Sequence, residues 1–263
     1  MITKFPLLSI ILLAATILSG APSEPVDADK IAAEAEISIE RAGLRGDAAA
    51  LAEAVKSLEA ALAVTPDQPA LVYTRGFASY VSSGLHRAPK DEAARERCLK
   101  DAASFLEHVK GAPWEAEAAA MRGAAFGELI ALAKDPAEAG ASFGPAAGQL
   151  LAQAIAAAPT SPRVLVFQGR SLLFTPQEFG GDPARGTALI QQAVDRFAAP
   201  GAQPSGPAWG RADALTWLGI AKQRAGDLAA ARAAWQQALT IEPNDAWVKF
   251  ALLPSLDKSM PKR

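Results

Sequence analysis

Apolar residues recur at helical spacing along much of the chain, and the pattern is clearest near its C-terminal end. One side of the segment 213–226 carries residues at i, i+3, i+4 and i+7, namely Leu215, Leu218, Gly219 and Lys222. The following segment has a second apolar face, made of Leu228, Ala231, Trp235, Ala238 and Leu239. The pattern therefore predicts two amphipathic helices, one directly after the other.

The residues between and beyond these helices predict a tight reversal of the chain. Gly226 can adopt the left-handed conformation that ends a helix, and Asp227 can cap the next one. Pro243 then stops the second helix. Because Gly219 and Ala231 are small, the two helices can cross closely, and Trp235 fills the space beyond. The segment is predicted to form a helical hairpin.

This hairpin resembles the tetratricopeptide repeat. The residues that match the pattern of that family are Leu218, Gly219, Ala231, Trp235, Ala238 and Pro243. Leu215 stands where the family has an early tryptophan, and Lys222 stands where a tyrosine is common. Since a single repeat leaves one apolar face bare, the resemblance implies that neighbouring repeats stack against it.

Related signals occur upstream of this hairpin. Gly76, Gly123 and Gly169 each lie in a helical apolar pattern as Gly219 does, at spacings longer than the roughly 34 residues of the family unit. Second-helix endings rich in alanine precede Pro66 and Pro159 as well. We expect about five hairpins, at 28–65, 69–110, 114–158, 162–198 and 207–242, and a final helix near 244–253. The predicted fold class is an all-α superhelical solenoid over 28–256, followed by a polar tail at 257–263.

The first 21 residues differ from the rest. Lys4 precedes an uncharged apolar run from Leu7 to Leu18, which is typical of an export signal. An uncleaved membrane anchor is the alternative, although the run is shorter than the roughly 20 residues that span a bilayer. Ala21 occupies the place where a lipoprotein signal has its lipid-accepting cysteine. The segment predicts an exported protein, and the resemblance to exported repeat proteins places it in a bacterial periplasm.

The composition of the chain argues against several classes of function. The 263 residues are 50% hydrophobic and carry a formal net charge of −2, with acids and bases mixed along the chain. This distribution predicts neither a nucleic-acid partner nor a basic membrane patch. The single cysteine, Cys98, cannot form an intramolecular disulfide and lies on an apolar helical stripe. Two histidines without ligand-spaced partners predict no metal, and no motif indicates a cofactor.

One motif suggests catalysis. The string GASFG, residues 140–144, matches a nucleophile elbow with Ser142 as nucleophile, which would make the protein a serine hydrolase. An elbow needs a strand before the serine, yet the preceding residues have a helical pattern, and both histidines lie upstream. We therefore interpret GASFGP as a linker into the next helix and expect no enzyme activity.

A binding surface is the remaining candidate. In the family that the hairpin resembles, first helices line a concave groove, and the corresponding positions here are Tyr73, Phe77, Tyr80, Arg163, Arg170, Phe174, Gln223 and Arg224. Such side chains can anchor a protein, peptide or acidic tail. The three aromatic residues from 73 to 80 also have the spacing of a core between repeats. The function expected is a non-catalytic scaffold, and the alternative is a small-molecule-binding accessory of a solute transporter.

Overall fold

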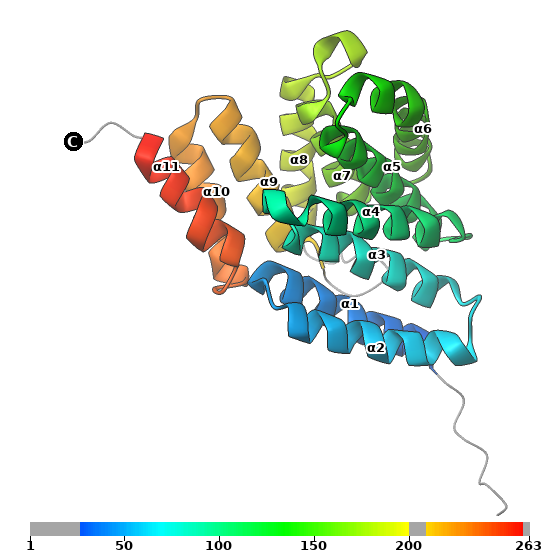
Figure 1. Ribbon diagram of the computed structural model, residues 1–263. Coiled ribbons are helices and arrows are strands. Elements are labelled where there is room, and N and C mark those ends of the chain that lie inside the picture. Colours follow the sequence, from blue (N-terminus) through cyan, green and yellow to red (C-terminus); the bar gives the residue numbers. More distant parts are fainter. Residues whose placement is uncertain (1–26, 200–208, 260–263) are drawn as a thin grey trace, which may run out of the picture.

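The computed structural model describes residues 27–199 and 209–259, and within these ranges every regular element is a helix. Ten helices follow one another in pairs, which are α1 Ala28–Arg45 with α2 Ala48–Val64, α3 Pro69–Leu85 with α4 Glu92–Glu107, α5 Trp114–Leu132 with α6 Pro136–Ala157, α7 Pro162–Phe174 with α8 Pro183–Ala198, and α9 Arg211–Arg224 with α10 Leu228–Ile241. The prediction of an all-α solenoid of helical hairpins is confirmed (Figure 1).

Short helical segments supplement the pairs. The 3₁₀ turns η1 Pro89–Asp91 and η2 Gln177–Phe179 lie between the helices of the second and fourth hairpins. A π-helical segment, η3 Val248–Leu252, leads into the last helix, α11 Leu253–Ser259. α11 covers the first residues of the predicted polar tail and extends beyond the predicted end of the final helix. It continues because Leu256 is fully buried against the fifth hairpin.

Aspartates begin five of these helices. Each accepts a hydrogen bond from a backbone amide in the first helical turn, 2.9 to 3.1 Å away, and the five are Asp27, Asp47, Asp135, Asp182 and Asp227. Such capping pairs amide groups that have no partner within the helix. The tight reversals before Asp47 and Asp227 need positive φ, and Gly46 and Gly226 supply it. Local sequence therefore fixes where the hairpins turn.

The hairpins stack in two layers. Each first helix packs against the first helix of the next hairpin, in the order α1, α3, α5, α7 and α9. The second helices α2, α4, α6 and α8 lie outside them, and each packs against the first helix of the following hairpin. This arrangement lets every hairpin bury the apolar face that it could not cover alone.

Glycines allow the two helices of a hairpin to approach closely. A Cβ atom on Gly76 would lie 2.6 Å from Leu106, one on Gly123 2.9 Å from Leu151, and one on Gly169 2.6 Å from Ile190. In the last hairpin a Cβ atom on Gly219 would lie 2.2 Å from Trp235 Nε1. Ala231, Trp235 and Ala238 are all fully buried in this hairpin. The repeated glycines are therefore contact positions, each facing a side chain of the partner helix.

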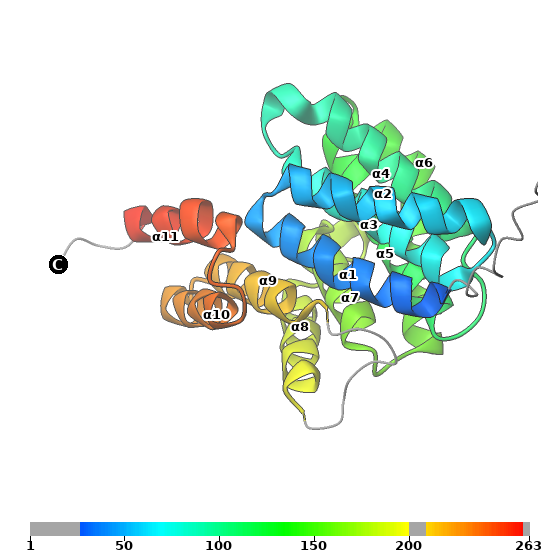
Figure 2. The ribbon, with the colours of Figure 1, turned by 90° about the horizontal axis from the view of Figure 1, so that it is seen from below.

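The first and last hairpins also meet. Arg45 at the end of α1 forms a 3.1 Å ion pair with Glu242, which follows α10. Glu40 of α1 accepts a 2.6 Å hydrogen bond from the amide of Gly210, just before α9. In Figures 1 and 2 the C-terminal end of α1 lies beside the segment that joins α10 to α11. The stack is thus closed by contacts between its two ends.

One sequence interpretation is wrong. The string GASFGP is not a linker, because residues 140–145 lie inside α6 and Pro145 is within the helix. The capping of α6 by Asp135 fixes the start of this helix upstream of the string. Phe143 then stacks on Phe126 of α5, with ring centroids 5.3 Å apart, and holds the segment in helical register against its partner.

Candidate functional site

The groove residues expected from the sequence fall into two groups. Tyr73, Phe77 and Arg163 are buried, at 0, 3 and 2% exposure, and form part of the interior. Tyr80 and Arg170 are half-buried, and Gln223 is partly exposed. Phe174 is 50% exposed and Arg224 is exposed. The expectation of one continuous open groove is therefore wrong for the first group, and the reason is the side chain that covers it.

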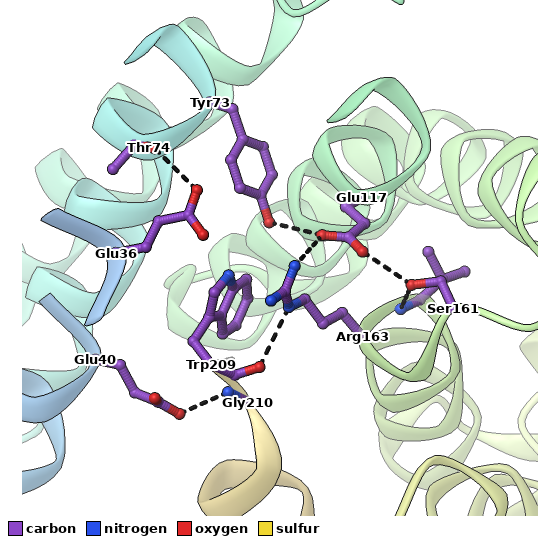
Figure 3. A network of polar contacts seen from close by, with 10 residues as sticks. Glu36, Glu40, Tyr73, Thr74, Glu117, Ser161, Arg163, Trp209 and Gly210 are labelled. Atoms are coloured by element: carbon purple, nitrogen blue, oxygen red, sulfur yellow. Dashed lines mark hydrogen bonds and ion pairs between the residues drawn. The ribbon is translucent and has the colours of Figure 1, made fainter. Parts of the chain in front are cut away.

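That covering side chain is Trp209, which directly precedes α9. Its ring stacks on Phe77 with centroids 4.1 Å apart, and the guanidinium of Arg163 lies 4.3 Å from the ring centroid on α7's side. Arg163 Nε also donates to the carbonyl oxygen of Trp209 at 3.3 Å. Figure 3 shows the indole between the residues of α1 and Arg163. Trp209 thus fills the space that an open groove would leave for a partner.

Glu117 of α5 organises the polar groups around this plug. Its Oε2 accepts hydrogen bonds from the hydroxyl of Tyr73 at 3.1 Å and from Arg163 Nη1 at 2.9 Å. Its Oε1 accepts from Ser161 Oγ at 3.0 Å, and Ser161 also caps α7 (Figure 3). A single buried carboxylate therefore links α3, α5 and α7, and it leaves Arg163 no free face for a ligand.

Two more carboxyl groups enter the same region from α1. Burial raises the pKa of Glu36 to about 8, although the charge of Arg163 and the hydroxyl of Thr74 act in the opposite direction. Glu36 Oε1 lies 3.1 Å from Thr74 Oγ1, and its Oε2 has no hydrogen-bond partner. Burial likewise raises the pKa of Glu40 to about 7. One arginine faces three carboxyl groups here, so a neutral Glu36 at pH 7 is the physically consistent state.

The second group of groove residues lies on a surface that we call the arginine–aromatic face, defined by Phe174, Trp217, Arg224, Trp247 and Arg87. Phe174 contacts Trp217 edge-on at 5.9 Å between centroids, and Trp217 contacts Trp247 at 5.5 Å. Arg224 lies over Phe174 at 4.8 Å and Arg87 over Trp247 at 3.9 Å. The rings form a continuous strip that joins α7, α9 and the C-terminal segment.

An ionic cluster supports this face from beneath. Arg170 lies 3.9 Å from the ring centroid of Trp217 and forms a 2.9 Å ion pair with Glu128. Glu128 also receives a 2.8 Å contact from Arg95 and a 2.7 Å hydrogen bond from Tyr80. Burial alone would raise the pKa of Glu128, but these donors outweigh it and hold the pKa below its ordinary value. Arg170 and Tyr80 therefore position the strip of rings above them.

Sequence reasoning did not identify Trp209, Glu36 or Glu117. A signal for Glu36 was present, because it shares the helix face of Ala32 and Ile39, both of which are buried. A carboxyl group on an apolar stripe indicates a partner or a raised pKa. No local pattern marks Trp209, which reaches Phe77 across 132 positions of sequence.

The structure also places Ser142 and Cys98, which the sequence analysis singled out. Ser142 is exposed on α6, where helix replaces the strand and sharp turn of a nucleophile elbow, so the GASFG string does not form such an elbow. Cys98 is half-buried, and burial raises the pKa of its thiol. The residues that the structure describes contain no cluster of three or more potential metal ligands, and none of their helices is both long and apolar enough to cross a bilayer. The predicted export signal lies outside the described residues.

Fold and site together define a helical-hairpin repeat protein with a strip of aromatic rings, exposed at Phe174 and buried at Trp217, that is rimmed by arginines. No protein-family model matches the chain, and no curated protein matches it. Among solved structures the chain is similar to MamA, residues 41 to the end, from Desulfovibrio magneticus RS-1, with 17% identity and a TM-score of 0.34 over 84% of this chain and 98% of that one. The repeat assignment rests on the helix pairs of this chain, since a TM-score of that size adds no support.

Proposed function

We propose that this protein is a non-catalytic scaffold of the bacterial cell envelope that holds an acidic peptide segment of a partner protein on its arginine–aromatic face. The export-signal pattern in residues 1–21 supports the compartment. The repeat fold supports a binding role, because stacked hairpins present extended surfaces from rigid elements. The arginine–aromatic face supports the acidic and apolar character proposed for the partner peptide.

The observation that carries the proposal is the state of Arg224. It is exposed, it is stacked on the half-exposed ring of Phe174, and it forms no ion pair with any residue in the described ranges. Arg170 below is different, because it is ion-paired with Glu128. The outer surface therefore keeps uncompensated positive charge, which is complementary to carboxylate groups of a partner.

The rings supply the second half of the recognition. Phe174 is 50% exposed, and Trp247 is half-buried, so both can still lose accessible surface on binding. Aromatic and arginine side chains in such contiguous strips dominate the energy of many interfaces. The strip is also held in place by the Arg170–Glu128 cluster, so little side-chain ordering is needed on association. An acidic peptide with an apolar side chain matches both features.

The test is a peptide-display selection on the wild-type protein, followed by affinity measurements on the selected peptides. We expect selected sequences to be enriched in Asp and Glu next to an apolar residue, and their affinity to fall with rising salt. Arg224→Glu should weaken binding by at least tenfold, while Arg97→Glu, the same charge change on the exposed outer side of α4, should not. Enrichment without acidic residues, or equal binding to Arg224→Glu, would exclude this face as the site.

A further inference from the structure

A second concavity lies away from the arginine–aromatic face. It is an open cleft of about 950 Å³ bounded by the C-terminal ends of α4 and α6, the first turns of α5 and the start of α7, with Arg196 of α8 at its border. None of the five residues that define the arginine–aromatic face lines it. The volume falls within the range of roughly 300 to 1,000 Å³ that is typical of small-molecule sites.

The lining of the cleft is partly apolar. Its accessible apolar residues include Ala116 and Ala119 of α5 and Leu150 and Ala157 of α6, whereas Leu106, Val109 and Ala154 are buried beneath them. Small alanine side chains on α5 and α6 leave the space open, since larger residues at these positions would fill it. A surface of this kind favours the apolar body of a ligand over a purely ionic one.

The three acidic residues of the lining all have hydrogen-bond or ion-pair donors. Glu107 is paired with Arg122 at 2.9 Å, Glu117 with Arg163 at 2.9 Å, and Glu115 accepts the amide of Gly111 at 2.9 Å. Each acid of the cleft therefore already has a donor.

The basic groups have fewer partners. Arg196, in the last turn of α8, forms no ion pair with a described residue, and its Nε is buried without a hydrogen-bond acceptor. The Nε of Arg122 is buried without an acceptor as well, although its Nη2 pairs with Glu107. Lys110 at the rim is exposed and unpaired among the described residues. The lining carries three acidic and three basic residues, and Arg196 and Lys110 are the two bases that have no ion pair with a described residue.

We infer that this cleft binds a small amphipathic anion, an alkyl or aryl carboxylate whose apolar part lies on the α5 and α6 alanines and whose carboxylate pairs with Arg196. Arg196 lines the cleft and forms no ion pair with a described residue, so a bound carboxylate would make a charge-assisted contact with it. The site does not depend on the proposed peptide face, because the two share no defining residue, and either can fail without the other.

Calorimetric titration of the full chain with octanoate tests the inference, with octan-1-ol as the neutral analogue and acetate as the anion without an apolar body. We expect saturable binding of octanoate to one site, at least tenfold weaker binding of octan-1-ol, and no measurable binding of acetate. Arg196→Gln should weaken octanoate binding about tenfold, since one charge-assisted contact is lost. Arg97→Gln on the outer side of α4 is the matched control and should leave it unchanged.

A blocking variant separates the cleft from other apolar surfaces. Gln153 is exposed on the α6 wall, so Gln153→Trp places an indole over the cleft without disturbing a buried position. This variant should abolish octanoate binding, whereas Gln236→Trp on the exposed side of α10 should not. The inference is overturned by octanoate binding that survives Gln153→Trp, by octan-1-ol binding as tightly as octanoate, or by the absence of saturable binding.

Discussion

Replacing Glu36 by glutamine removes a titratable group from the centre of the protein, and we expect it to reduce the loss of stability at high pH. Glu36 is fully buried, and its pKa is raised from 4.5 to about 8 by burial. At pH 7 the folded protein therefore binds a proton at this position that the unfolded chain has released. Folding must take up that proton, and the free energy of unfolding falls as the proton becomes scarce.

The sign and size follow from the two pKa values. The stability that the neutral carboxyl group allows is fully present below pH 4.5 and is lost as the pH rises through about 8. Relative to a protein with a group that does not titrate here, the free energy of unfolding is lower by about 3 kcal/mol at pH 7. Above pH 8 the difference approaches about 5 kcal/mol, because each pH unit between the two pKa values contributes about 1.36 kcal/mol. Glutamine has nearly the same shape and no charge, so Glu36→Gln should gain stability over wild type by these amounts.

The assay is urea unfolding followed by circular dichroism at pH 5, 7 and 8.5. An amide in place of the carboxyl group adds a donor that must be accommodated, and this contribution does not vary with pH, so the slope of the difference against pH is diagnostic. Glu34→Gln, on the exposed side of the same helix, is the control and should follow the wild-type curve. A difference that is constant from pH 5 to 8.5, or that turns against the variant as pH rises, would refute a neutral Glu36 and make it a charge partner of Arg163.

Two further substitutions test the packing. Gly219→Ala should lower the free energy of unfolding by about 1 to 3 kcal/mol, because its Cβ would meet Trp235 Nε1 at 2.2 Å. Gly127→Ala on the open side of α5 should raise the free energy of unfolding by roughly 0.5 to 1 kcal/mol through helix propensity. Urea titrations measure both variants, and equal effects would contradict close contact at Gly219. Trp209→Ala should lower the free energy of unfolding by about 3 to 5 kcal/mol, since a buried indole is lost from between Phe77 and Arg163. A change below 1 kcal/mol in the same titration would show that Trp209 is not part of the stable interior.

The hairpins could be predicted because their determinants are local. Asp227 and Gly226 fix a turn within two residues, and Gly219 faces Trp235 only 16 positions later. Helical periodicity and caps act over one or two helical turns, and the small contact residues act within one hairpin, so all of them are visible in the chain order. The reading of GASFGP as a linker failed because two glycines and a proline carry a local signal for a loop, and a tertiary contact between Phe143 and Phe126 outweighs it.

The candidate site was only partly predictable, because it depends on how the ends of the stack meet. The family resemblance supplied Tyr73 and Arg163 as groove positions, and the structure places both on first helices but buries their side chains. It could not show that Trp209 would cover them, since that contact joins α3 to the segment before α9. Register along a solenoid accumulates small rotations from each hairpin, so a contact between first and last units is not encoded by any one repeat.

Closure has a consequence for how such a stack can bind. With α1 tied to the start of α9 through Glu40 and Gly210, and to the end of α10 through Arg45 and Glu242, the inner layer faces its own charges, and Trp209 packs against Phe77 and Arg163 there. Burying those charges costs stability unless they are paired or neutral; Glu117 is paired with Arg163, and burial raises the pKa of Glu36 to about 8, which favours its neutral form at pH 7. A partner that entered the interior would have to displace Trp209 and break this balance. Binding at the outer strip around Phe174 and Arg224 requires neither change, because those side chains remain accessible in the closed stack.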